Sequence, residues 1–165
     1  MPPVAENDVF IKSPSGAGAG VRSDFPILSR TFGGRPLIYL DSAAVVKLVH
    51  AEPESAALRV WLDERAENQW ISSVLTEIES FRALARYAPE AASRLPAVLD
   101  QMNLIDLDQH IRMLARAVTP TVRSLDAIHL GTALRSRSSL ISFVTYDRRL
   151  LDAAQAAALP IDSPT

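Results

Sequence analysis

The chain has 165 residues, of which 48% are hydrophobic, no cysteine, and a formal net charge of -2 at pH 7. This length favours one domain of ordinary size, and the lack of cysteine excludes a disulfide scaffold, thiolate zinc sites and a cysteine nucleophile. The near-zero charge excludes the bulk basic field of a typical high-affinity DNA-binding protein, so any nucleic-acid contact has to be local.

The first 35 residues differ in composition from the rest. They contain four prolines and a run of Ser, Gly and Ala over 15–20, without any apolar periodicity. Such a segment cannot bury enough apolar surface to repay its ordering entropy, so we expect a flexible N-terminal extension at 1–35 and a folded domain over 36–165. No run approaches the ~18 apolar residues of a membrane span, and no signal-peptide pattern opens the chain. We expect a cytoplasmic protein without membrane contact.

Short apolar runs alternate with helical patterns from residue 36 onward. Strands are predicted over 37–40, 70–72, 104–107 and 140–144, because these runs are apolar on both faces or nearly so. Helices are predicted over 42–50, 53–65, 75–87, 89–101, 109–117 and 125–136, from apolar spacings of three and four. Alternation of this kind predicts an α/β fold with a parallel sheet covered by helices on both faces.

Four acidic residues are predicted at one edge of this sheet. Asp41 directly follows the first strand and Asp147 follows the last. Asp126 lies in the first turn of the helix that precedes the last strand, and Glu79 lies on the helix that follows the second. Function in open parallel sheets collects at the carboxyl ends of the strands, so these carboxylates could meet there.

Each acid also has a purely structural interpretation. Asp41 and Asp147 could cap the helices that follow them, and Asp126 could complement a helix dipole. Glu79 could pair with Arg82 one turn further along its helix. Spacing alone leaves open whether Glu77 or Glu79 faces the cluster, since the two lie about 200° apart on a helix.

Crowded carboxylates repel one another unless hard cations neutralise them. Mg²⁺ and Mn²⁺ prefer oxygen ligands and keep positions open for a phosphate. The pattern therefore indicates metal-assisted hydrolytic phosphoryl transfer, with oxygens of Asp41, Glu79 and Asp126 within reach of a cation. His129, one turn after Asp126, is more typical of a satisfied core histidine than of a metal ligand.

Four segments in order resemble the PIN-domain family, especially the VapC-type ribonuclease toxins of type II toxin–antitoxin systems. They are 37–48, which carries Asp41; 73–84, in which the spacing from Ser73 matches the family acid to Glu79; 123–130, which carries Asp126; and 143–150, which carries Asp147. The similarity covers about residues 37–162. The first 35 residues match nothing in the family.

The resemblance implies a three-layer α/β/α sandwich with a mostly parallel central sheet and an endoribonuclease dependent on Mg²⁺, with Mn²⁺ possible. It assigns metal binding and catalysis to Asp41, Glu79, Asp126 and Asp147, and orientation of the last acid to Thr145. Ala43 departs from the family, which commonly has Ser or Asn there, so a supporting hydrogen bond could be lost. The resemblance also implies an RNA substrate, a cognate antitoxin, and a homodimer or toxin–antitoxin hetero-oligomer.

Basic residues near the predicted site are candidates for RNA contact: Arg82, Arg86, Arg148 and Arg149. The alternative function is a catalytically weak PIN-like module that binds RNA or a protein partner, which Ala43 favours. A haloacid-dehalogenase-type phosphatase, which also begins with an Asp after its first strand, is disfavoured because Ala43 occupies the place of its second Asp.

Overall fold

The computed structural model describes residues 34–119 and 121–165. The predicted N-terminal extension at 1–35 therefore lies outside the described residues except for Gly34 and Arg35.

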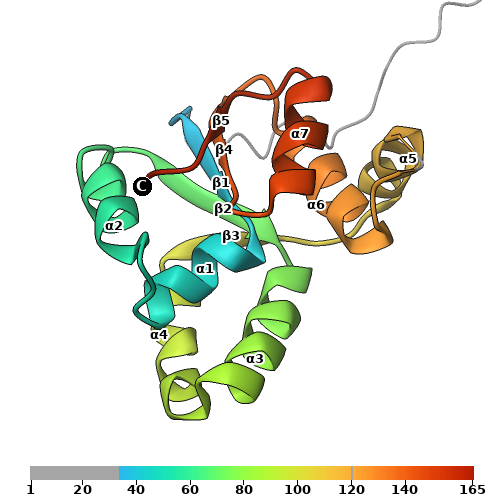
Figure 1. Cartoon of the computed structure of the whole chain (residues 1–165). Coiled ribbons are helices and arrows are strands. Elements are labelled where there is room, and N and C mark those ends of the chain that lie inside the picture. Colours follow the sequence, from blue (N-terminus) through green and yellow to red (C-terminus); the bar gives the residue numbers. More distant parts are fainter. Residues whose placement is uncertain (1–33, 120) are drawn as a thin grey trace, which may run out of the picture. The chain divides into compact units, whose positions relative to one another are not determined.

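The core of the domain is a sheet of five parallel strands in the order β3-β2-β1-β4-β5 (Figure 1). The strands are β1 Leu37–Leu40, β2 Gln69–Ser73, β3 Met102–Ile105, β4 Leu140–Val144 and β5 Ile161–Asp162. The prediction of a parallel sheet is confirmed. The strand predicted at 104–107 begins and ends two residues earlier, and the short edge strand β5 was not predicted.

Seven α-helices and one 3₁₀ segment connect the strands in the described part of the chain. They are α1 Ser42–Val49, α2 Ser55–Asp63, α3 Leu75–Tyr87, the 3₁₀ segment η1 Pro89–Arg94, α4 Leu95–Leu99, α5 Gln109–Ala117, α6 Ser124–Arg135 and α7 Arg148–Ala156. The single helix predicted at 89–101 is divided into η1 and α4, and α7, which was considered only as a helix that Asp147 could cap, had no predicted bounds. None of these helices has the length and apolar character needed to cross a membrane.

Each face of the sheet packs against its own set of helices. Ile38 and Leu40 of β1 join a core with side chains of α1, α2 and α3, whereas Leu37 and Tyr39 join a second core with side chains of α6 and α7. This division follows from the alternation of side chains along a strand. Figure 1 shows α1–α4 and α5–α7 as separate groups beside the sheet. The α/β/α prediction is confirmed.

The strand order reverses direction between β1 and β4. The chain first runs outward from β1 to β2 and β3, and later returns to add β4 on the other side of β1. Ligands of open α/β sheets bind in the crevice at the carboxyl ends of strands beside such a reversal. Asp41 follows β1, and Thr145 and Asp147 follow β4, so all three lie at this position.

Candidate active site

Asp41 is buried at the end of β1, with 2% of its surface exposed. Its Oδ1 accepts the backbone N–H of Ala44 at 2.8 Å and so caps α1. Its Oδ2 accepts the hydroxyl of Thr145 at 2.5 Å. Capping therefore occupies one oxygen, and Thr145, which directly follows β4, orients the other. Burial raises the pKa of Asp41 above its ordinary value, although these two hydrogen bonds act against the rise.

Thr145 connects two of the predicted acids. Its hydroxyl donates to Asp41 and accepts the backbone N–H of Asp147 at 3.1 Å. Oδ1 of Asp147 accepts the N–H groups of Arg149 and Leu150, so Asp147 caps α7. Ala43 has no side-chain donor, so the side-chain hydrogen bond to the Asp41 carboxylate comes from the Thr145 hydroxyl.

Asp126 lies in the first turn of α6 and is half-buried. Burial, and then the negative charge of Asp147, raise the pKa of Asp126, and Glu79 adds to the rise. Glu79 also raises the pKa of Asp41. These mutual effects mean that all four carboxyl groups lie within electrostatic range of a neighbour at this edge of the sheet.

Glu79 and Glu77 point in different directions from α3. Oε2 of Glu79 lies 2.7 Å from Nε2 of the buried His129 on α6. Glu77 is exposed and lines a groove beside Phe81. Among the ion pairs of the described residues, the partner of Glu79 is His129 and not Arg82.

The expectation that oxygens of Asp41, Glu79 and Asp126 share the reach of one cation is not met in this structure. Within 34–119 and 121–165, no three His, Asp or Glu side chains are close enough together to hold a metal ion. Hydrogen bonds to His129 and Thr145 hold Glu79 and Asp41 in this arrangement, and carboxylates without a counter-charge repel one another.

The donor set still fits a hard divalent cation by its chemistry. The candidate ligands are carboxylates, and Asp41 and Asp126 carry pKa values raised by burial and by neighbouring negative charge, which a cation would lower. Capping and orienting bonds engage one oxygen each of Glu79 and Asp147, and among the described residues the second oxygen of each has no hydrogen-bond partner.

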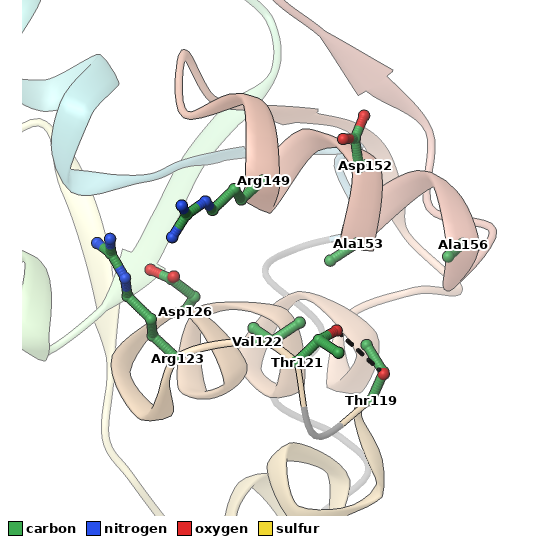
Figure 2. Close-up of a pocket in the computed structure, with 9 residues that line it drawn as sticks. All are labelled: Thr119, Thr121, Val122, Arg123, Asp126, Arg149, Asp152, Ala153 and Ala156. Carbon is green, nitrogen blue, oxygen red and sulfur yellow. Dashed lines mark hydrogen bonds between the residues drawn. The ribbon is translucent and has the colours of Figure 1, made fainter.

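A pocket of about 420 Å³ adjoins Asp126 between the start of α6 and α7. Figure 2 shows the carboxylate of Asp126 at the same end of the pocket as the guanidinium groups of Arg123 and Arg149. Arg148 is exposed at the start of α7, and Arg82 and Arg86 are exposed on α3. The structure thus brings one of the four predicted RNA-contact arginines, Arg149, into a cavity beside a candidate acid.

Sequence reasoning missed three residues of this region. Arg123, which lines the pocket, stands directly before α6 and could have been considered for that reason. The other two are Tyr39 and Ser73: the hydroxyl of Tyr39 accepts the backbone N–H of Ser73 and is hydrogen-bonded to Nδ1 of His129. These two hydrogen bonds join residues that are 34 and 90 positions apart, so no local sequence pattern indicates them.

Comparisons with known proteins agree with this architecture. Residues 38–156 match the model of the PIN domain family. The chain is 46% identical over 131 residues to "Ribonuclease VapC35" of Mycobacterium tuberculosis, covering 78% of this chain and 97% of that protein.

Two solved structures share the fold. One is VapBC2 from Rickettsia felis bound to a DNA fragment from its promoter, with a TM-score of 0.63 and 13% identity over 78% of this chain and 99% of that chain. The other is a toxin-antitoxin complex from Klebsiella pneumoniae, with a TM-score of 0.55 and 19% identity over 78% of this chain and 98% of that chain.

Proposed function

The chain belongs to the PIN-domain family, in its VapC branch, and on that premise we propose that it is a metal-dependent endoribonuclease that hydrolyses RNA phosphodiester bonds. The observation that carries the proposal is the arrangement at the strand-order reversal. There Thr145 bridges Asp41 and Asp147, and Asp126 and Glu79 lie within electrostatic range. A relative that is 46% identical bears the name of a ribonuclease.

The cofactor in this proposal is Mg²⁺ or Mn²⁺, held by Asp41, Glu79, Asp126 and Asp147. A bound ion supplies charge neutralisation at the phosphate and a more acidic water. Thr145 holds the buried carboxylate of Asp41 in place, and Asp147 is fixed by the start of α7. In the reaction a water oxygen bonds to phosphorus, the bond from phosphorus to one ribose oxygen breaks, and that oxygen takes a proton.

RNA contact in this proposal is local to the acidic edge. Arg123 and Arg149 line the pocket beside Asp126, where their charges would engage phosphates on either side of the scissile bond. The volume of about 420 Å³ is within the range of small-ligand pockets and suits an unpaired nucleotide. Arg82, Arg86 and Arg148 would extend the basic surface.

The proposed protein partners are a cognate antitoxin and a second copy of the chain. Helix α3 exposes three large apolar side chains, Ile78 (60%), Phe81 (55%) and Tyr87 (74%). Large exposed apolar patches mark protein–protein interaction sites. Phe81 also lines a groove of about 570 Å³ against α4 and β3. Co-expression with a candidate antitoxin tests this assignment: Phe81→Asp should abolish co-purification that the wild type shows.

A second candidate function is a PIN-like module that binds RNA without cutting it. One observation favours it, namely that no three acidic or histidine side chains of the described residues converge on a metal-sized position. The retention of four carboxylates at one edge favours the nuclease, because their mutual repulsion destabilises the fold unless a bound cation neutralises the charge.

Incubation of a total RNA pool with the purified protein separates the two functions. The pool is treated with Mg²⁺, with Mn²⁺ or with EDTA, beside the Asp41→Asn variant, and the new RNA ends are mapped. Metal-dependent ends that are absent with Asp41→Asn support the nuclease. Intact RNA that still binds wild type and variant equally well supports the binding module.

A further inference from the structure

A buried histidine beside the acidic edge is bonded at both ring nitrogens. His129 on α6 is 1% exposed. Its Nδ1 lies 2.6 Å from the hydroxyl of Tyr39 on β1, and its Nε2 lies 2.7 Å from Oε2 of Glu79 on α3. The ring thus links the middle layer of the fold to one candidate metal ligand through two short hydrogen bonds.

Tyr39 is also fixed by burial, ring packing and hydrogen bonds. It is fully buried, stacks on Phe143 with ring centroids 4.9 Å apart, and meets the His129 ring edge-on at 5.9 Å. The backbone N–H of Ser73 donates to its oxygen at 3.1 Å.

An ionised carboxylate only accepts hydrogen bonds, so Nε2 of His129 is the donor to Oε2 of Glu79. The Tyr39 oxygen accepts the Ser73 N–H, and the same hydroxyl is hydrogen-bonded to Nδ1 of His129. A chain of polar contacts therefore runs from Ser73 through Tyr39 and His129 to Glu79.

We propose that Tyr39 and His129 are positioning residues, which hold Oε2 of Glu79 and leave Oε1, which has no hydrogen-bond partner among the described residues, as the oxygen that would be available to a divalent cation. This proposal rests on the proposed nuclease function. His129 is then an orienting partner of a ligand and not a ligand itself, because both of its nitrogens are engaged. Partners of this kind fix a ligating carboxylate and raise metal affinity.

Simple core packing does not account for this arrangement. A histidine of α6 that is buried against β1 carries two polar nitrogens that an apolar residue of similar size would lack. Burial of such groups is costly unless both are bonded. The bonds are made, and they end on the one glutamate of α3 that faces α6. The polar chain therefore serves Glu79 rather than the packing of the core.

The test compares variants that keep or remove the donor to Glu79. His129→Gln places an amide N–H near the position of Nε2, His129→Leu removes both nitrogens, and Tyr39→Phe removes only the hydroxyl. The exposed His110→Gln and His110→Leu are the matched controls. Mn²⁺ affinity is measured by electron paramagnetic resonance, the His129 tautomer by nitrogen NMR of the metal-free protein, and the fold by thermal unfolding.

We expect Mn²⁺ affinity to fall about 10- to 100-fold in His129→Leu, less in Tyr39→Phe and His129→Gln, and not in the controls. NMR should show the Nε2–H tautomer in the wild type and a changed Nδ1 signal in Tyr39→Phe. A wild-type ring without a proton on Nε2, or unchanged Mn²⁺ affinity in the folded His129→Leu and Tyr39→Phe variants, overturns the positioning role.

Failure of the proposed function has a different signature. If the wild type bound no Mn²⁺ and left RNA intact, both the nuclease and the positioning role would be wrong, even with the Nε2–H tautomer present. If the wild type bound Mn²⁺ and cut RNA while the folded variants matched it, the nuclease would stand and the positioning role alone would be rejected.

Discussion

The hydroxyl of Thr145 donates to Oδ2 of the buried Asp41 across the point where the strand order reverses. The two residues are 104 positions apart in the chain, and the bond between them is 2.5 Å long. It joins the ends of β1 and β4, beside a backbone bond from Asp41 N–H to the Val144 carbonyl at 3.2 Å. Two strands thereby fix one carboxylate before any ligand binds.

Replacement of Thr145 by Val removes this donor and keeps the shape of the side chain. We expect a loss of about 10- to 100-fold in RNA cleavage, because Asp41 loses its orientation, and a stability loss of ~1–3 kcal/mol, because a buried acceptor is left unpaired. Cleavage rates and thermal unfolding measure the two effects. Thr145→Ser keeps the hydroxyl and should retain most of the activity; equal activity in Thr145→Val would remove Thr145 from the site.

The metal-free protein should be stabilised by Asp41→Asn at neutral pH. The folded state raises the pKa of Asp41, so between the ordinary and the raised value the folded chain binds more protons than the unfolded chain, and stability falls as pH rises through that window. Asn keeps the cap acceptor and carries no charge, and its amide N–H can donate to the Thr145 oxygen in place of the hydrogen bond that Oδ2 accepts. Thermal unfolding in EDTA should show a gain at pH 7 that shrinks at pH 4. Lower stability of the variant at pH 7 would contradict this account.

The opposite effect is expected when a divalent cation is added. Mg²⁺ or Mn²⁺ should raise the unfolding temperature of the wild type, because binding to the folded state alone stabilises it. The Asp41→Asn variant should gain less. Equal shifts in both proteins would locate the ion elsewhere on the chain.

The periodicity of the sequence was sufficient for most of the fold. The run at 37–40 and the run at 140–144 became β1 and β4 with the predicted bounds, because each is apolar and short. Helix α7 was indicated only by the possible cap at Asp147, although Leu150 and Ala154 also supply an apolar spacing. Strand β5 has two residues, and its pairing to β4 depends on the sheet rather than on its own sequence.

The candidate site could be predicted in part, for a physical reason. Asp41 and Asp147 are positioned by the ends of strands, which the sequence indicates. The direction of Glu79 depends instead on its contact with His129, 50 positions away. Local patterns carry no information on that contact.

Separate replacement of Glu77 and Glu79 by Gln tests which glutamate serves the site. Glu79→Gln should reduce RNA cleavage by at least about 100-fold, since it removes a charge from the acidic edge. Glu77→Gln should leave cleavage within about twofold, because Glu77 lines the groove beside Phe81 instead. The two variants share a helix and a charge change, so each is the matched control of the other. Equal losses in both would reject the assignment to Glu79.

The pocket beside Asp126 predicts the salt dependence of RNA binding. Arg123→Gln and Arg149→Gln should each weaken binding of a fluorescent single-stranded RNA in EDTA and reduce the slope of log affinity against log salt by about 0.7, if each residue neutralises one phosphate. Fluorescence anisotropy over a salt series measures both quantities. Arg112→Gln, on the exposed face of α5, is the control and should change neither. An unchanged slope in both pocket variants would place the RNA elsewhere.

Gly131 sets the distance between α5 and α6, and with it the position of His129 and Asp126. A Cβ at Gly131 would lie 2.9 Å from both Ala115 N and Ile111 O, which are backbone atoms of α5 and cannot rotate away. Gly131→Ala should therefore destabilise the fold by ~1–3 kcal/mol, although alanine favours a helix over glycine by ~1 kcal/mol. Thermal unfolding measures the sign. Since displacement of α6 also moves His129, Mn²⁺ affinity should fall in the folded fraction; a stabilised variant with intact affinity would show that the two helices separate freely.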